Sequence, residues 1–362
     1  MGLNILAALA LLLAYLAAFI NPAKFLWPAL FGLAYPYILL VNLLFLFYYI
    51  IRLKPTLLIS LLVILLGWNN LMNLVPIHLE KDTPPESLSS DAFLKVLSYN
   101  VRSFNIYKHS KAIDAREEIF RFLSKEDADI ICLQEYFTTP NPGHREEDLD
   151  RTLTATPYKS VYYGYIRPNR SAWGIATYSK YPIIKRSRIP FSNTTNVAMY
   201  TDIKILDDTI RIFNLHLQSI KLRERNYDFM GDLKLKYTDE QMEGFRDIGA
   251  HLKQAFILRA EQANVIANYI TQSPYPVILM GDFNDTPVSY AYRKIKKGLH
   301  DAFRESGRGF GNTYAGELPS FRIDYILYSD PFRSHDFKRT KIKSSDHYPV
   351  RTYLYLNDSS DL

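Results

Sequence analysis

The feature that most constrains the fold is an apolar run that ends abruptly in polar side chains. In VILMGDFND, residues 277–285, four apolar residues follow Pro276 and end at Gly281. A short apolar run bounded in this way is typical of a strand buried on both faces. Because side chains alternate along a strand, we expect Asp282 and Asn284 on the same side of its C-terminal end. Such a pair can hold a metal ion, a water molecule or a phosphoryl oxygen.

The same pattern recurs along the chain, which makes it informative. A single strand that ends in Asp or Asn indicates little, since these residues also begin turns and caps. Here four other apolar runs end in or carry polar groups, and a further stretch adds an Asp-His pair. They are VLSYN with Asn100, IICLQE with Glu135, IRIFNLHL with Asn214 and His216, FRIDYILY with Asp324, and KSSDHYPV with Asp346 and His347.

Taken in order, SYN, LQE, NLHL, GDFN, RIDYIL and SDHYPV resemble the motifs of the endonuclease/exonuclease/phosphatase superfamily. That superfamily includes deoxyribonuclease I, abasic-site endonucleases, inositol polyphosphate 5-phosphatases and neutral sphingomyelinases. The resemblance runs from about Leu94 to Tyr355 and implies a four-layer α/β/β/α sandwich. It implies an enzyme, a Mg²⁺-dependent phosphoric ester hydrolase, but it leaves the substrate open.

The predicted metal site consists of oxygen ligands. Hydrolysis of a phosphate ester requires neutralised phosphoryl oxygens, an activated water and a stabilised leaving oxygen. In the implied fold Asn100, Glu135 and Asp346 lie near one another. Carboxylate and amide oxygens suit a hard cation such as Mg²⁺ or Mn²⁺. No cysteine or histidine cluster with zinc spacing is present in the sequence.

The predicted catalytic residues are His216, Asp282, Asn284, Asp324 and His347. By resemblance, Asp324 orients the His347 ring and favours its protonated form. Asp282 with Asn284 resembles the pair that positions and deprotonates the attacking water. His216 matches a second histidine that assists the phosphate or the leaving group. The sequence leaves open whether Asp282 or His347 activates the water.

The first 79 residues differ from the rest of the chain because their only charged side chains are Lys24, Arg52 and Lys54. The stretches 2–20, 25–51 and 55–77 contain no charged residue, and each is long enough for a helix to cross a hydrocarbon core of about 30 Å. We therefore predict three transmembrane helices. The alternative for the first stretch, a cleaved signal peptide, is disfavoured because no basic region precedes it and two more apolar stretches follow.

The charges of the short loops predict the orientation. Arg52 and Lys54 form the more basic loop, which the positive-inside tendency places in the cytoplasm. The chain after about residue 78 is then expected outside. This predicts a multi-pass protein of the cell (inner) membrane with an extracytoplasmic catalytic domain.

The predicted domain boundaries follow the changes in composition. Residues 1–79 form the anchor, 80–91 a polar linker with two prolines, 92–357 the catalytic domain and 358–362 a tail. Within the catalytic domain, strands alternate with helices expected at 109–128 and 246–272. Residues 219–245 mix basic and aromatic side chains, which suits either a solvated helical insert or a lid that touches the membrane.

The leading hypothesis is a membrane-anchored phosphoesterase acting on a phosphorylated lipid or another phosphoester at the bilayer surface. One alternative is a nuclease, but residues 91–362 carry an excess of only five basic side chains, too few and too dispersed to indicate a nucleic-acid groove. The other alternative is a catalytically silent membrane scaffold. The sequence does not indicate an oligomeric state.

Overall fold

A computed structural model covers the whole chain and describes residues 1–78, 92–107, 114–168, 170–220, 239–316 and 319–356. The predicted linker and tail lie outside these residues, as does most of the 219–245 insert. By contacts, the chain divides into two compact units. The first contains Met1–Leu71, Gln218–Asn264 and Asn284–Lys294, and the second contains Met72–Leu217, Val265–Phe283 and Ile295–Leu362.

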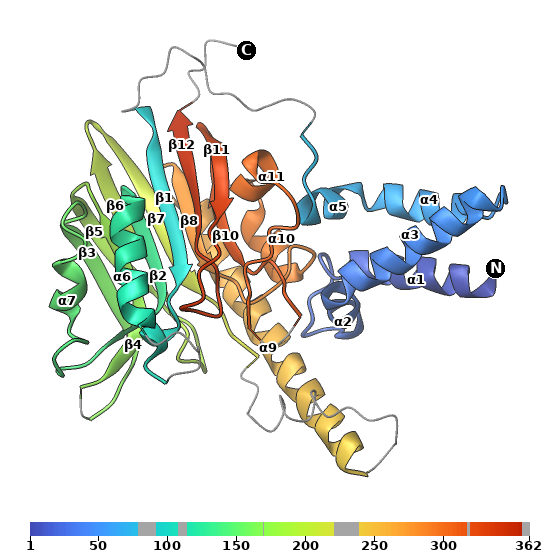
Figure 1. The fold of residues 1–362 in the computed structure, drawn as a ribbon, viewed down its shortest axis with the longest axis horizontal. Coiled ribbons are helices and arrows are strands. Elements are labelled where there is room, and N and C mark those ends of the chain that lie inside the picture. The colour runs from blue at the N-terminus through green and yellow to red at the C-terminus, as the bar shows by residue number, and fades with distance from the viewer. Residues whose placement is uncertain (79–91, 108–113, 169, 221–238, 317–318, 357–362) are drawn as a thin grey trace. The chain divides into compact units, whose positions relative to one another are not determined.

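The second unit contains two six-stranded sheets (Figure 1). The first sheet has the order β11 (Phe332–Arg339), β12 (Val350–Leu356), β1 (Leu94–Asn100), β2 (Ile130–Thr138), β4 (Ala172–Ser179) and β3 (Tyr158–Ile166). The second has the order β5 (Ile183–Ile189), β6 (Ala198–Ile205), β7 (Asp208–His216), β8 (Val277–Asp282), β10 (Asp324–Tyr328) and β9 (His300–Asp301).

Each sheet contains one parallel pair, and a helix connects its two strands. In the first sheet α6 (Ala115–Glu126) connects β1 to β2, and in the second α9 (Asp239–Thr271) lies between β7 and β8 in the chain. The C-terminal ends of parallel neighbours meet at one edge of a sheet. Asn100 is consequently opposite Gln134, and His216 is opposite Asp282. These two crossovers are the strand-helix-strand units expected from the sequence.

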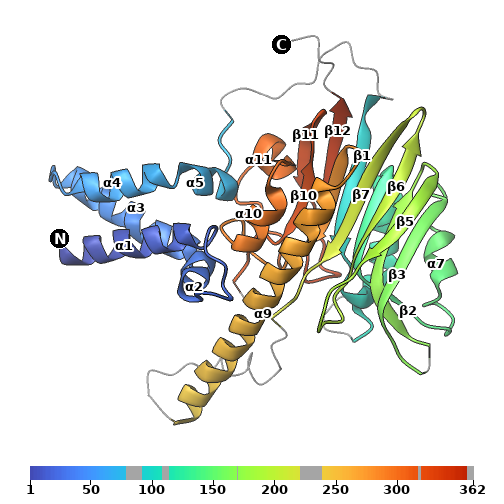
Figure 2. The same ribbon diagram turned by 180° about the vertical axis from the view of Figure 1, so that it is seen from behind.

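The apolar core lies between the two sheets. Val96 and Ile130 of the first sheet share one buried cluster with Ile212 and Met280 of the second. On the outer face of the first sheet, Leu97 and its neighbours pack with residues of α6. The second sheet, with β5, β6 and β7, faces the viewer in Figure 2, and Tyr269, from the part of α9 that belongs to this unit, lies 6.2 Å from Tyr200 of β6. Because side chains alternate along a strand, each sheet contributes one set of residues to the core between the sheets and another set to its outer face.

The remaining elements of this unit are short. They are a turn of 3-10 helix at Arg102–Asn105, α7 (Glu146–Asp150), α11 (Ala302–Ser306), and the end of α10 (Tyr290–Lys296). The last residues of α5 (Trp68–Leu74) also belong here. Arg322 donates to the Asn73 carbonyl at 2.9 Å and pairs with Asp301 at 2.8 Å, and all three residues are buried.

The first unit contains the apolar helices α1 (Gly2–Leu16), α2 (Trp27–Leu33), α3 (Tyr35–Ile51) and α4 (Leu57–Leu66). Polar side chains connect them, since Asn42 donates to the Ala7 carbonyl at 3.0 Å and Ser60 donates to Asn4 at 2.7 Å. Hydrogen bonds of this kind commonly connect apolar helices.

The apolar segments are not three continuous helices. Within the described residues no single helix is both long and apolar enough to cross a membrane. Two bent pairs meet the criterion together: α2 with α3, bent by 70°, and α4 with α5, bent by 71°. The first break falls at Ala34, just before Pro36 at the second position of α3, where proline is tolerated in a first turn but not within a helix. The second falls at Gly67, the weakest helix former after proline.

Candidate active site

The deepest part of the site is a histidine-carboxylate pair. His347 Nδ1 lies 2.9 Å from Asp324 Oδ2, and both side chains are buried. Thr313 fixes the start of β10, because its hydroxyl accepts the backbone N–H groups of Ile323 and Asp324. The Tyr314 ring packs edge-on against the imidazole at 5.6 Å. With Nδ1 engaged, the imidazole presents Nε2 to the rest of the site.

The pKa of His347 reflects two opposing effects. Burial alone lowers it, but the carboxylates of Asp324 and Asp282 outweigh burial and hold it well above its ordinary value. The metal-free site therefore favours the imidazolium form of His347.

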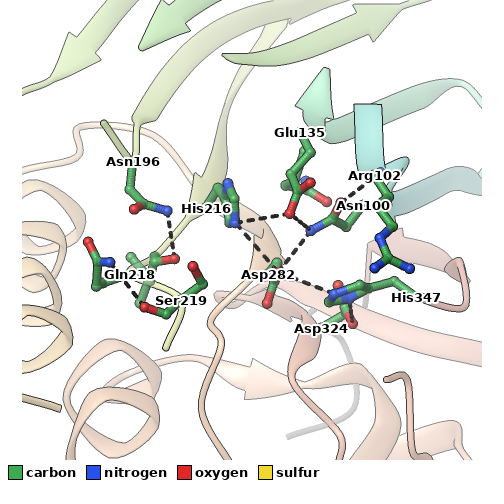
Figure 3. A network of polar contacts seen from close by, with 12 residues as sticks. Asn100, Arg102, Glu135, Asn196, His216, Gln218, Ser219, Asp282, Asp324 and His347 are labelled. Atoms are coloured by element: carbon green, nitrogen blue, oxygen red, sulfur yellow. Dashed lines mark hydrogen bonds and ion pairs between the residues drawn. The ribbon is translucent and has the colours of Figure 1, made fainter. Parts of the chain in front are cut away.

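Asp282 lies at the centre of the cluster (Figure 3). Its Oδ2 accepts a hydrogen bond from Asn100 Nδ2 at 3.0 Å. The same oxygen is 3.7 Å from His216 Nε2 and 3.8 Å from His347 Nε2. Strand β8 thus supplies the buried carboxylate, and three residues surround it: Asn100 from β1, His216 from β7 and His347 from the segment before β12.

Glu135 reaches this centre from a bulge in β2. The pairing of β2 with β4 shifts between Leu133 and Tyr136, and Glu135 has φ 50°, in the left-handed region. Bulges of this kind re-aim a side chain and are frequent beside active sites. The Glu135 carboxylate accepts from Asn100 at 3.2 Å and lies 3.8 Å from His216 Nε2. Burial, with the charge of Asp346 next in size, raises the pKa of Glu135.

Asp346 and Arg102 form the outer rim of the cluster. Their side chains pair at 3.3 Å and remain partly exposed. Residues 102–105 all have positive φ, which is unusual for non-glycine residues. The Ser345 hydroxyl donates to the Asn100 carbonyl at 2.8 Å, which connects the loop that carries Asp346 to the end of β1.

The charges of the cluster suit a divalent cation. Among the described residues, the four carboxylates of Glu135, Asp282, Asp324 and Asp346 contact the Arg102 guanidinium, the protonated His347 and the His216 ring, so carboxylates outnumber the cationic groups. A hard divalent ion takes carboxylate oxygens and would balance the excess. Asp282, Asp324 and His347 also offer ligand atoms within 4.8 Å of one another. A protonated imidazole cannot ligate a metal, so the more exposed oxygens of Glu135 and Asp346 fit better.

Asn100 is placed differently from a simple ligand. Its Oδ1 accepts the Arg102 N–H at 3.0 Å, while its amide group donates to both Glu135 and Asp282. Oriented in this way, Asn100 holds two carboxylates in position, and it would contact a cation only through the remaining lone pair of Oδ1.

The structure brings together seven of the eight residues that the sequence singled out: Asn100, Glu135, His216, Asp282, Asp324, Asp346 and His347. Their catalytic and metal-binding roles stay predictions. Strand β8 ends at Asp282, so the alternation expected to pair Asp282 with Asn284 does not reach Asn284, which has φ 52° and belongs to the other compact unit.

Asn214 is fully buried between the two sheets and has a structural role. It accepts from Gln134 at 2.8 Å and donates to the Ala176 carbonyl at 2.9 Å, so it bridges the two sheets.

Several positioning residues were not identified in the sequence. Asn196 donates to the Leu217 carbonyl at 2.9 Å and fixes the chain directly after His216. Thr313 and Tyr314 support the His347–Asp324 pair from a loop that no motif marks. Ser345 had a local signal, because it precedes Asp346 and His347 in the sequence, and a strand-end motif rich in small polar residues suggests backbone support.

Solved structures of similar fold come from several sources. An endonuclease/exonuclease/phosphatase from Beutenbergia cavernae is 17% identical, with 74% of this chain and 72% of that one covered and a TM-score of 0.55. An endonuclease/exonuclease/phosphatase from Bacteroides vulgatus is 16% identical over 73% and 99%, with a TM-score of 0.54. The human Nocturnin catalytic domain with a bound sulfate anion is 17% identical over 74% and 95%, with a TM-score of 0.51. These likenesses show a shared two-sheet α/β fold.

No curated protein sequence matches the chain. Residues 1–74 match a family described as a domain of unknown function (DUF8431). Residues 97–347 match the model of the Endonuclease/Exonuclease/phosphatase family. Because this match covers well over half of the chain, the protein belongs to the endonuclease/exonuclease/phosphatase family of phosphoric ester hydrolases, which typically depend on a divalent metal ion.

Proposed function

We propose that the protein is a membrane-anchored, Mg²⁺- or Mn²⁺-dependent hydrolase that cleaves a phosphate ester of a lipid or lipid-linked substrate at the bilayer surface. One observation carries the catalytic part of this proposal. A buried group of Asp282, Asp324 and His347 adjoins the partly exposed carboxylate of Glu135. The buried group would transfer protons, and the exposed carboxylate beside it would bind the cation.

Each residue of the cluster has a separate role in the proposed reaction. Asp282 receives the proton of the attacking water, since its Oδ2 is held by Asn100 and lies within 4 Å of both imidazoles. His347, oriented by Asp324, directs Nε2 toward the transferred phosphoryl group. His216, whose Nε2 lies between Glu135 and Asp282, assists the leaving oxygen. A divalent ion held by Glu135 and Asp346, with Asn100, would neutralise charge on the phosphoryl oxygens.

The lipid part of the proposal depends on the N-terminal apolar segments. With a tether in the bilayer, the catalytic unit meets substrates of the same plane at a high effective concentration. The basic loop at Arg52 and Lys54 favours an extracytoplasmic catalytic unit. The bent helix pairs can contribute to such an anchor by their length and composition.

A panel assay tests the substrate class. Detergent-solubilised full-length protein with Mg²⁺ is offered phospholipids, polyprenyl phosphates, inositol phosphates and plasmid DNA, with Asp282→Asn as the inactive control. We expect turnover of a lipid phosphate that EDTA abolishes. Efficient nicking of DNA without lipid turnover would overturn the lipid proposal.

The nuclease alternative has one observation of its own. The Arg167 guanidinium stacks on the Trp173 ring at 4.8 Å, close to the end of β2 that carries Glu135. Aromatic and arginine faces of this kind can stack on nucleobases. Binding of DNA that weakens steeply with salt, and that Trp173→Ala abolishes, would favour this alternative.

A further inference from the structure

The second compact unit contains a cavity distinct from the cluster around Asp282. Helix α11, residues 307–312 and strand β11 form it, and its volume is about 760 Å³. Its lining includes His78, Arg308, Phe310, His335, Lys338 and Arg339. Ligand sites in proteins typically have volumes of about 300 to 1,000 Å³. None of these six side chains has a role in the mechanism above.

The charges of this cavity favour an anion. Its two carboxylates are already engaged: Glu305 by His300 at 2.9 Å and by the Tyr328 hydroxyl, and Asp336 by Arg351 at 3.1 Å. Arg308 is exposed and makes no ion pair or hydrogen bond with any described residue. Lys338 is 58% exposed at the side chain and pairs with Asp336 at 3.2 Å.

The loop that carries Arg308 is rich in glycine for a steric reason. Gly309 has φ 72° and Gly311 has φ 60°, a region that favours glycine. A Cβ at Gly311 would also lie 2.4 Å from the Phe303 ring. Arg339 donates to the Asn312 carbonyl at the end of this loop. The loop thus holds Arg308 and the 64% exposed Phe310 over the cavity.

The chain that leaves the third apolar segment borders the same cavity. That segment is predicted to end at residue 77, and His78 Nε2 lies 3.1 Å from the Gly307 carbonyl. Arg304 of α11 donates to Asn73 Oδ1 at 3.2 Å, and Arg322 donates to the Asn73 carbonyl. Three contacts therefore bind Asn73 and His78 to this unit, and His78 lines the cavity. The cavity therefore borders the chain directly after the predicted end of the third apolar segment.

We infer that this cavity binds the phosphate-bearing headgroup of an anionic lipid from the bilayer in which the chain is anchored. Arg308 and Lys338 contact the phosphate, while Phe310 inserts among the upper acyl chains, where aromatic side chains are favoured. This inference rests on the membrane attachment in the proposed function, but not on the substrate or on catalysis.

A binding measurement in micelles tests the cavity. Full-length protein in dodecyl maltoside is titrated with dihexanoyl-phosphatidylglycerol, with dihexanoyl-phosphatidylcholine, and with inorganic phosphate. The test variant is Arg308→Gln with Lys338→Gln, and the matched control is Lys185→Gln with Arg186→Gln on the exposed edge strand β5. We expect the test variant to bind the anionic lipid about tenfold more weakly or worse, because two charge-assisted contacts are lost. The control variant should bind like the wild type.

Two outcomes overturn the inference. One is equal affinity of the wild type and the test variant for the anionic lipid. The other is inorganic phosphate binding as tightly as the lipid, which would make the cavity a site for a soluble anion. A second measurement leaves the charges of the cavity unchanged. In it, Phe310 is replaced by a photo-crosslinking phenylalanine analogue, which should capture phosphatidylglycerol in nanodiscs. Carbonate extraction of the chain from membranes tests the attachment separately, so failure of the anchor and failure of the cavity are distinguishable.

Discussion

The inner and outer halves of the candidate site differ in their contact with water. Asp282 and Asp324 are 1% exposed and His347 is 5% exposed, whereas the side chains of Glu135 and Arg102 are 35% and 30% exposed. Interactions between charges are stronger where water is excluded. The inner half is therefore suited to orient and transfer protons. The outer half keeps room for a cation, its waters and a phosphate.

The largest expected effect comes from the inner half. Asp282→Asn keeps the shape of the side chain but removes the proton acceptor, and we expect kcat to fall by about a thousandfold, within the range known for general bases. The measurement is steady-state turnover on the substrate found in the panel. His300→Gln, which alters a histidine outside the site, should retain activity. Turnover of Asp282→Asn within a few-fold of the wild type would remove Asp282 from the mechanism.

The outer half should respond through the metal ion. Glu135→Gln removes a charged oxygen while it retains an acceptor for Asn100. We expect the Mg²⁺ concentration for half-maximal activity to rise by about ten- to a hundredfold, comparable to the loss seen when groups around a metal are altered. Titration of activity with Mg²⁺ checks this. An unchanged midpoint would place the cation at Asp282, Asp324 and His347 instead.

The pKa of His347 tests the electrostatics of the inner half without catalysis. In the metal-free protein, NMR titration should show this pKa well above its ordinary value, and Asp324→Asn should lower it. Because the folded state binds this proton more tightly, the imidazolium stabilises the fold at low pH. This contribution is lost as the pH rises through the folded-state pKa. A pKa that does not change in Asp324→Asn would contradict the assigned pair.

The smallest effect is expected at the rim. Arg102 pairs with Asp346 at 3.3 Å in a partly exposed position, and such pairs contribute at most about 1 kcal/mol to stability. Arg102→Gln should therefore change the free energy of unfolding in denaturant by less than about 1 kcal/mol. A larger loss would mean that residues 102–105 depend on this pair for their left-handed conformation.

Much of this arrangement was predictable from strand periodicity. An apolar run that ends in a polar residue identifies the end of a buried strand, and parallel neighbours bring such ends together. This reasoning applies to His216 and Asp282, which are opposite one another on the parallel strands β7 and β8. Asn100 comes from the other sheet, so its 3.0 Å contact with Asp282 also depends on how the two sheets pack.

Other features depend on contacts that no local pattern encodes. Glu135 adopts a left-handed conformation in a run without glycine, because the bulge between β2 and β4 imposes it. The direction of the Asn100 amide depends on the Arg102 N–H and two carboxylates from distant segments. The breaks at Ala34 and Gly67 divide apolar stretches whose composition alone suggested unbroken helices. The bend at each break was thus beyond a prediction based on length and hydropathy.

The contact between Arg322 and Asn73 shows that residues before the predicted linker already belong to the catalytic unit. Asn73, Asp301 and Arg322 lie in the same compact unit, and the buried guanidinium of Arg322 binds both the Asn73 carbonyl and the Asp301 carboxylate. Lengthening the 80–91 segment should therefore leave Asn73 bound to this unit, whereas Arg322→Ala should release it.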